Sequence, residues 1–396
     1  MNHPHPRALF PVLLLIGAAA CRESAAEAGW RGSVETLPNG VERVHNPAVG
    51  MWGDDDGWSI VEEMRLGSID SDGPEMFGEV RGLQLDALGR IYVLDGQAKE
   101  VRVFDAEGKH VRSFGRQGGG PGELEDPAAL LWGPDDNLWV VDQRNARFSV
   151  FDTAGTYLTS HPRPGGLAIL PWPGGFDRQG RLHDLAISMK PGSPPITGLT
   201  RFSSQLEPED TFARPPYAEQ TFELRMGNNI MMVGVPFAPR QVWELGPDGD
   251  VWLGVSDQYR LHRVNYDGDT LRIVEREFEP VEVTEADREE GMERLQRFID
   301  RGGVVDETRI PATKPAFRDL TVDDRGNLWV RPTAQAGEED HLFDLFDPEG
   351  RYLGQIRSPF PVAPSAPLLV RGDTILAVTE DELGVGYVVR ARIERR

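Results

Sequence analysis

The chain has 396 residues, 64 acidic and 42 basic side chains, and a formal net charge of −22. Its one cysteine, Cys21, cannot close an intramolecular disulfide or supply a cysteine cluster for zinc or iron–sulfur. An acidic chain lacks the basic face that a phosphate backbone requires, so no nucleic-acid partner is expected. The 44 glycines and 31 prolines instead predict many short strands joined by tight turns.

Residues 1–21 have the pattern of an export signal. Arg7 precedes an apolar run that is too short to span a bilayer, and a run of small residues leads directly to Cys21. This pattern resembles a bacterial lipoprotein signal peptide, so we expect a lipid on Cys21 to attach the protein to a membrane. Ordinary cleavage that leaves a free thiol is the alternative. Arg22, which is not aspartate, favours the outer membrane of a Gram-negative bacterium over the inner one. Residues 22–57 show little periodicity and are interpreted as a tether.

A four-strand unit repeats along residues 58–396. Each copy has two strands joined by a turn, a third strand, a turn of the form D-x-x-G, and a fourth strand. We place the start of the second strand at residues 90, 137, 181, 250, 327 and 373, which gives six copies. The two long spacings contain insertions at about residues 217–240 and 280–315. Repeats of this kind stack their units side by side to bury a continuous core.

The ends of the repeat array predict a closed ring. The sixth copy has only three strands, whereas one unassigned strand over residues 58–68 precedes the first copy. If this strand completes the last copy, no sheet edge is left exposed. The prediction is therefore an all-β fold: a six-bladed β-propeller of four-stranded antiparallel blades, with the last blade closed by the N-terminal strand and with one inserted helix.

Two local patterns add detail to this fold. Thr284 and Asp287 form a capping box that predicts the start of the inserted helix, and Gly302 or Gly303 ends it. Large rings recur at one place in the second strands, where we expect them to pack between blades. These positions are Tyr92, Trp139, His183, Trp252 and Trp329.

The second copy carries a family resemblance. Residues 138–152, with Asp142, Asn145 and Arg147, resemble an NHL repeat, and the glycine-rich connector over residues 114–124 is similar to one in bacterial propeller lipoproteins. The chain thus resembles the NHL-repeat-like six-bladed β-propeller bacterial lipoproteins. The resemblance implies a fold and a recognition surface, and it implies no particular chemistry.

The candidate ligand site is the mouth of the central channel. Arg81, Arg240 and Arg318 lie at or just before the predicted innermost strands, which line the channel. Three arginines at one mouth would suit a carboxylate or a phosphate. Four acidic residues are expected near them at this mouth, so the alternative is that these charges pair across blades and hold the ring together. The acids are Glu79, Asp126, Glu244 and Asp319.

The histidines occur singly, and no nucleophile or metal-binding motif is present, so we expect no catalytic residues, no metal and no cofactor. The favoured function is that of a lipid-anchored, monomeric, extracytoplasmic binding or scaffold module. Its ligand would be a protein, a glycan or a small anion. The alternative is a metal-dependent propeller enzyme that resembles gluconolactonases or peptidyl-amide lyases, with the same four acids supplying oxygen ligands at the channel.

Overall fold

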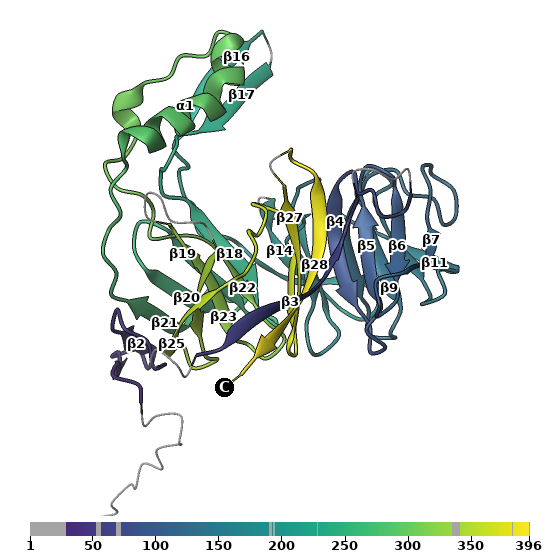
Figure 1. The fold of residues 1–396 in the computed structure, drawn as a ribbon, viewed down its shortest axis with the longest axis horizontal. Coiled ribbons are helices and arrows are strands. Elements are labelled where there is room, and N and C mark those ends of the chain that lie inside the picture. The colour runs from purple at the N-terminus through teal and green to yellow at the C-terminus, as the bar shows by residue number, and fades with distance from the viewer. Residues whose placement is uncertain are drawn as a thin grey trace, which may run out of the picture.

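A computed structural model describes residues 29–52, 57–68, 73–189, 192, 195–227, 229–334, 341–381 and 383–395. Cys21 and the signal segment lie outside these residues. Six four-stranded units form a ring around a central axis, and a smaller unit of two strands and a helix stands over one side of the ring (Figure 1). The predicted fold class, a six-bladed β-propeller, is confirmed.

The first three blades follow one another along the chain, each running from its innermost to its outermost strand. Blade 1 consists of β4 (Val80–Leu85), β5 (Ile91–Asp95), β6 (Glu100–Phe104) and β7 (His110–Phe114). Blade 2 consists of β8 (Pro127–Trp132), β9 (Leu138–Asp142), β10 (Arg147–Phe151) and β11 (Tyr157–Pro162). Blade 3 consists of β12 (Gly175–Phe176), β13 (Leu182–Ser188), β14 (Ile196–Phe202) and β15 (Pro208–Phe212).

The last three blades complete the ring. Blade 4 has β18 (Gln241–Leu245), β19 (Val251–Val255), β20 (Arg260–Val264) and β21 (Thr270–Arg276). Blade 5 has β22 (Phe317–Val322), β23 (Leu328–Pro332), β24 (Leu342–Phe346) and β25 (Tyr352–Arg357). Blade 6 has β26 (Leu368–Arg371), β27 (Thr374–Glu380), β28 (Gly386–Glu394) and, as its outermost strand, β3 (Ser59–Leu66).

Each second strand begins one residue after its predicted start because a tight turn fixes the boundary. In blade 1 the Asp86 carboxylate accepts the amide N–H groups of Leu88 and Arg90 at 2.9 Å each. Gly89 closes this turn with φ +76°, a conformation that costs a residue with a side chain. Asp177 in blade 3 and Asp323 in blade 5 accept amides in the same pattern.

The N-terminal strand closes the ring as predicted. β3 pairs with β28 in antiparallel register, with Ile60 opposite Ile393 and Leu66 opposite Val388. The last blade therefore contains strands from both ends of the chain, and unfolding of either end opens the ring. A closed ring also leaves no blade without a neighbour on either side.

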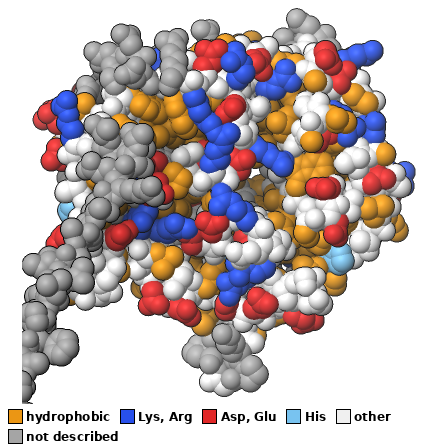
Figure 2. Space-filling model, turned by 90° about the horizontal axis from the view of Figure 1, so that it is seen from below, with side chains coloured by type: hydrophobic (Ala, Val, Ile, Leu, Met, Phe, Trp, Pro, Cys, Tyr) orange, Lys and Arg blue, Asp and Glu red, His pale blue; other side chains and the backbone are white. Residues whose placement is uncertain are grey.

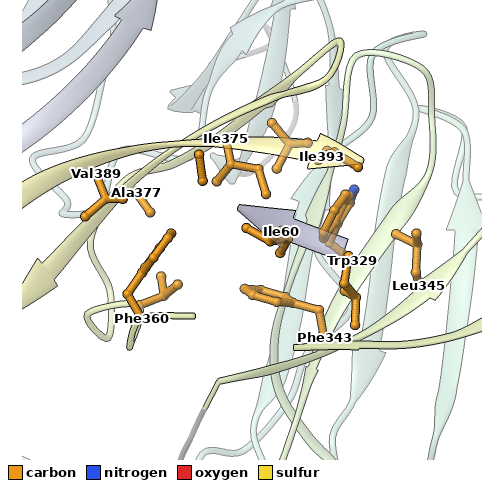
Figure 3. Close-up of a cluster of buried hydrophobic side chains, with 13 residues drawn as sticks. Ile60, Trp329, Phe343, Leu345, Phe360, Ile375, Ala377, Val389 and Ile393 are labelled. Atoms are coloured by element: carbon orange, nitrogen blue, oxygen red, sulfur yellow. The ribbon is translucent and has the colours of Figure 1, made fainter. Parts of the chain in front are cut away.

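The core consists of clusters that lie between consecutive blades rather than one central mass. In the described part of the chain, each of the six blade junctions has such a cluster. Figure 3 shows the junction of blades 5 and 6, where Trp329 lies among Ile60, Phe343 and Ile393. The rings of Tyr92, Trp139, Trp252 and Trp329 all belong to such junctions, which confirms the predicted packing between blades.

The tether expected over residues 22–57 is partly wrong, because this segment contains two strands. β1 (Ser33–Thr36) pairs with β2 (Glu42–Asn46), and β2 pairs in parallel with β21, which extends blade 4 to six strands. Asn46 at the end of β2 is only 3% exposed. Its amide donates to the carbonyl oxygens of Glu275 and Gly350, and its side-chain oxygen accepts from Tyr352 N and Trp30 Nε1. Asn46 therefore ties the N-terminal segment to blades 4 and 5.

The two predicted insertions pack against each other as one unit, which we call the cap. The first forms a hairpin of β16 (Thr221–Met226) and β17 (Asn229–Gly234); the second contains α1 (Glu285–Asp300) and a short 3₁₀ helix, η2 (Glu307–Arg309). The predicted capping box of Thr284 and Asp287 is present. Phe222, Leu295 and Phe298 share one buried cluster. Among the described residues, no helix has both the length and the apolar character needed to cross a bilayer.

Candidate functional site

A cleft of about 930 Å³ lies between the cap and the propeller face on which the innermost strands begin. Both insertions contribute to it, through Phe237 near the hairpin and Leu295 on α1, and blade 5 contributes Phe317. The volume falls within the range of small-molecule sites, which are commonly apolar with a few polar groups. We call this space the cap cleft.

Two of the three predicted arginines line the cap cleft. Arg240 directly precedes β18, and Arg318 is the second residue of β22 in the next blade. The Arg240 guanidinium donates to the main-chain oxygen of Arg318, from Nη2 at 2.5 Å and from Nε at 3.2 Å. Arg294 from α1 and Arg331 from β23 also line the cleft, and neither was predicted.

Positive charge converges on Arg318. Burial and the guanidiniums of Arg331, Arg240 and Arg294 together lower the pKa of Arg318 to about 10, whereas Asp319 opposes the shift. Arg331 is itself buried and donates from Nε to Asp319 Oδ1 at 3.1 Å. Four arginines from two blades and the cap thus surround one region of the cleft.

Glu244 and Asp319 lie together on adjacent innermost strands, β18 and β22. Burial and the nearby Asp319 carboxylate raise the pKa of Glu244 to about 8. Glu244 is therefore largely protonated at neutral pH and adds little negative charge there. Both residues were predicted as candidates, and the structure places them on the same side of the ring as Arg240 and Arg318.

The third predicted arginine, Arg81, lies in a different environment. Arg81 and Arg318 occupy the same bulge at the start of their innermost strands. Arg81 forms ion pairs with Glu79 at 2.8 Å and with Asp126 of blade 2 at 2.6 Å. These three residues therefore match the alternative in which charges join neighbouring blades, and they do not line the cap cleft.

The four candidate acids are consequently divided between two places. Glu79 and Asp126 belong to the Arg81 ion pairs, whereas Glu244 and Asp319 lie on blades 4 and 5. Within the described ranges, no three His, Cys, Asp or Glu side chains converge in an arrangement that could hold a metal ion. A single oxygen-ligand site built from all four acids is therefore not formed.

The glycine-rich connector between blades 1 and 2 has a structural partner. Asn145 donates to the Gly118 carbonyl oxygen at 3.0 Å, and Arg147 donates to the carbonyl oxygens of Gly120 and Glu123 at 2.8 and 2.7 Å. These two residues of blade 2 thus hold the connector in place. The connector is therefore a crossover between blades 1 and 2 that is fixed by hydrogen bonds to its carbonyl groups.

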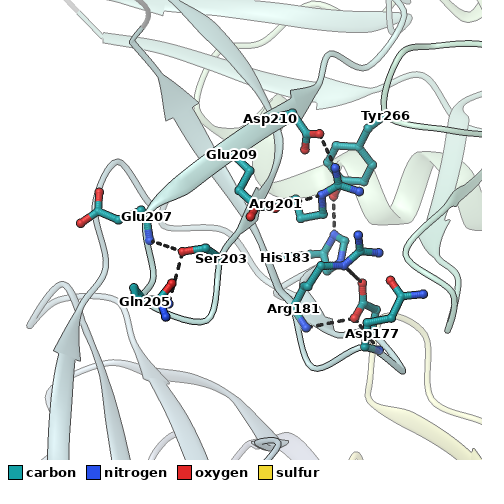
Figure 4. A network of polar contacts seen from close by, with 11 residues as sticks. Asp177, Arg181, His183, Arg201, Ser203, Gln205, Glu207, Glu209, Asp210 and Tyr266 are labelled. Atoms are coloured by element: carbon teal, nitrogen blue, oxygen red, sulfur yellow. Dashed lines mark hydrogen bonds and ion pairs between the residues drawn. The ribbon is translucent and has the colours of Figure 1, made fainter.

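In the second strand of blade 3, His183 occupies the position that a tyrosine or tryptophan fills in blades 1, 2, 4 and 5. It is fully buried, and its Nε2 lies 3.0 Å from Asp177 Oδ2 while its Nδ1 contacts the Tyr266 hydroxyl of blade 4 (Figure 4). Burial opposes ionisation of Asp177, but hydrogen bonds from His183 and Arg181 hold the pKa of Asp177 at about 2. This network joins two blades and lies outside the cap cleft.

The face opposite the cap carries the turns between first and second strands. Lys and Arg side chains gather around the middle of this face among acidic ones (Figure 2). Its turn residues pair across blades: Arg178 of blade 3 with Asp248 of blade 4 at 2.6 Å, and Arg325 of blade 5 with Asp373 of blade 6 at 3.5 Å. These charges are used between blades, so the cap cleft is the stronger candidate site.

The geometry defines a six-bladed β-propeller with a capped face. Residues 77–160, which span blades 1 and 2, match the profile of a protein family described as "6-bladed beta-propeller". No curated protein matches the sequence.

Several solved structures are similar to this chain at low sequence identity. A Bacteroides fragilis NCTC 9343 protein whose export is inferred is similar at 12% identity and a TM-score of 0.50, covering 89% of this chain and 99% of its own. The match with virginiamycin B lyase from Staphylococcus aureus (10% identity, TM-score 0.42) covers 85% of this chain and 99% of the lyase. The match with a gluconolactonase from Xanthomonas campestris (12% identity, TM-score 0.42) covers 81% of this chain and 86% of the gluconolactonase. At this identity the Bacteroides fragilis structure supports the fold alone, and the two enzymes, with TM-scores below 0.5, carry no argument.

Proposed function

We propose that this protein is a lipid-anchored, extracytoplasmic binding module that holds its ligand in the cap cleft. The observation that carries the proposal is the cleft itself, an open space of about 930 Å³ built jointly by two insertions and the propeller face. Sequence insertions that meet over one face of a rigid ring are typical of recognition elements placed on a stable scaffold. The similar Bacteroides fragilis protein, whose export is inferred, is consistent with an extracytoplasmic location.

The position of the N-terminal segment supports presentation of the cleft to a ligand. The first described residues lie near β2 at one end of the molecule, and the cap lies at the other end (Figure 1). Seven residues separate Cys21 from Gly29. An extended chain of that length spans roughly 28 Å from Cys21 to Gly29. A lipid on Cys21 would therefore hold the propeller near the membrane with the cap cleft directed away from it.

The lipid anchor has a direct test. Replacing Cys21 with alanine is expected to move the protein from the membrane fraction to the soluble fraction, because the acyl attachment site is lost. Intact mass of the parent protein should show acyl groups on a chain that begins at Cys21. An unmodified thiol on the mature chain would contradict lipidation and leave the binding proposal intact.

Ligand binding is tested by placing a photo-crosslinking amino acid at Ala238 or Thr333, both of which line the cap cleft. Leu158 on β11 of blade 2 is 47% exposed and provides the control position. After irradiation in the producing cells, the two cleft positions are expected to gain the same adduct mass and the control position to gain none. Identical adducts at all three positions, or no adduct at the cleft positions, would contradict the proposal.

A further inference from the structure

We infer that the cap cleft takes an amphiphilic anion, a ligand with an apolar body and one acidic head group. This inference rests on the proposed function and names its ligand class. It is carried by two features that meet in one space: an apolar wall formed largely by the cap and an arginine cluster at the start of the innermost strands of blades 4 and 5.

Both insertions contribute residues to the apolar wall. Pro236, Phe237 and Ala238 follow the hairpin, and Pro315 lies at the end of the second insertion; all four line the cleft and are partly exposed. A ligand that covers such a wall gains about 25 cal/mol for each Å² of apolar surface removed from water. A small inorganic anion would leave this wall in contact with water, so a ligand with an apolar body fits better.

The acidic head group is assigned from the pairing of charges inside the cleft. Three of its five cations have their own carboxylates: Lys314 with Asp287, Arg294 with Glu290, and Arg331 with Asp319. Arg240 differs, because in the described part of the chain it makes no ion pair and donates to one main-chain oxygen. A guanidinium has five N–H groups, so Arg240 keeps donors for a ligand carboxylate.

Electrostatics favours one acidic group over many. The pKa of Arg318 is lowered partly by Arg331, Arg240 and Arg294, so an anion placed among these side chains would relieve their mutual repulsion. The whole chain carries a net charge of −22. Its field would repel a polyanion more strongly than a ligand with a single charge. The arginine cluster and the overall negative charge together favour an amphiphile with a single negative charge.

The test compares two probes that share an apolar body, 4-phenylbutyrate and 4-phenylbutan-1-ol. Calorimetric titration of the full chain in detergent, with detergent alone as the blank, should show about tenfold tighter binding of the acid, the ratio given by about 1.4 kcal/mol from a charge-assisted hydrogen bond. Arg240→Gln should reduce this ratio to below about threefold. Arg357→Gln, a matched change at an exposed residue of β25 outside the cleft, should leave the ratio unchanged.

The outcomes separate the inference from the proposed function. Equal binding of acid and alcohol, or an Arg240→Gln variant that keeps the tenfold ratio, would overturn the acidic head group. Binding of neither probe would overturn the amphiphile, while cleft-specific adducts would still support a binding module. A third probe, N-acetyl-phenylalanyl-leucine, distinguishes sources: tighter binding than phenylbutyrate indicates a peptide C-terminus, and weaker binding indicates a free organic acid.

Discussion

Replacing Trp329 with alanine is expected to lower the free energy of unfolding by about 3–5 kcal/mol, the range for removing a large buried aromatic side chain. Trp329 is 1% exposed and packs between blades 5 and 6 against Ile60 of the closing strand and Phe343. The loss creates a cavity at a junction that includes the N-terminal strand, so ring closure is weakened as well. Urea unfolding followed by circular dichroism measures the change.

Two further variants make the Trp329 result decisive. Trp329→Phe keeps most of the ring and should cost less than the alanine variant, which covers the case in which the latter does not fold. Trp30→Ala removes a tryptophan outside the ring that donates one hydrogen bond to Asn46, and it should cost about 1 kcal/mol. Equal costs for Trp30→Ala and Trp329→Ala would show that the blade junction is not the source of stability.

Glu244→Gln is expected to stabilise the protein at pH 8 and to have little effect at pH 5. The folded-state pKa of Glu244 is about 8, raised from an ordinary value of 4.5 by burial and Asp319. The folded state keeps this proton while the unfolded state loses it, so stability falls as pH rises from about 4.5 to about 8. The difference corresponds to about 2–5 kcal/mol at pH 8, and glutamine removes it because the amide does not ionise.

Unfolding free energies of the parent and Glu244→Gln at several pH values between 5 and 8 test this expectation. Glu223→Gln is the control, because Glu223 is exposed on the hairpin and the same charge is removed. The gap between the parent and Glu244→Gln should widen with pH, whereas the gap for Glu223→Gln should stay constant. If the plots of unfolding free energy against pH were parallel for all three proteins, Glu244 would have its ordinary pKa in the folded state, and the expectation would be wrong.

The fold was predictable because its signals are local and repeated. Turns such as the one at Asp86 recur in the same place in successive blades, and the missing fourth strand of the last copy required a strand from elsewhere. β1 and β2 were missed because β2 joins the sheet through β21, about 230 residues away in the sequence, and no repeat marks either strand. The alternation of Phe222, Leu224 and Met226 signals a strand, but no strand was predicted within the first insertion.

The candidate site was only partly predictable because it depends on which blades are neighbours. Arg240 and Arg318 come together since blades 4 and 5 are adjacent, whereas Arg81 in blade 1 finds Asp126 in blade 2. The order of the blades along the sequence therefore indicates which of these residues lie on neighbouring blades. The contribution of Arg294 depends on how the helix packs on the hairpin, and no spacing in the sequence expresses that contact.

The attachment of β2 to blade 4 has a mechanical consequence. In a chain held at its N-terminus, tension from the membrane reaches β1 and β2 before it reaches β3. It would have to strip β1 from β2, and then β2 and Asn46 from blades 4 and 5, before any load acted on the pairing of β3 with β28. If Cys21 carries a lipid, β1 and β2 would therefore bear the tension first, and the pairing of β3 with β28 would stay unloaded.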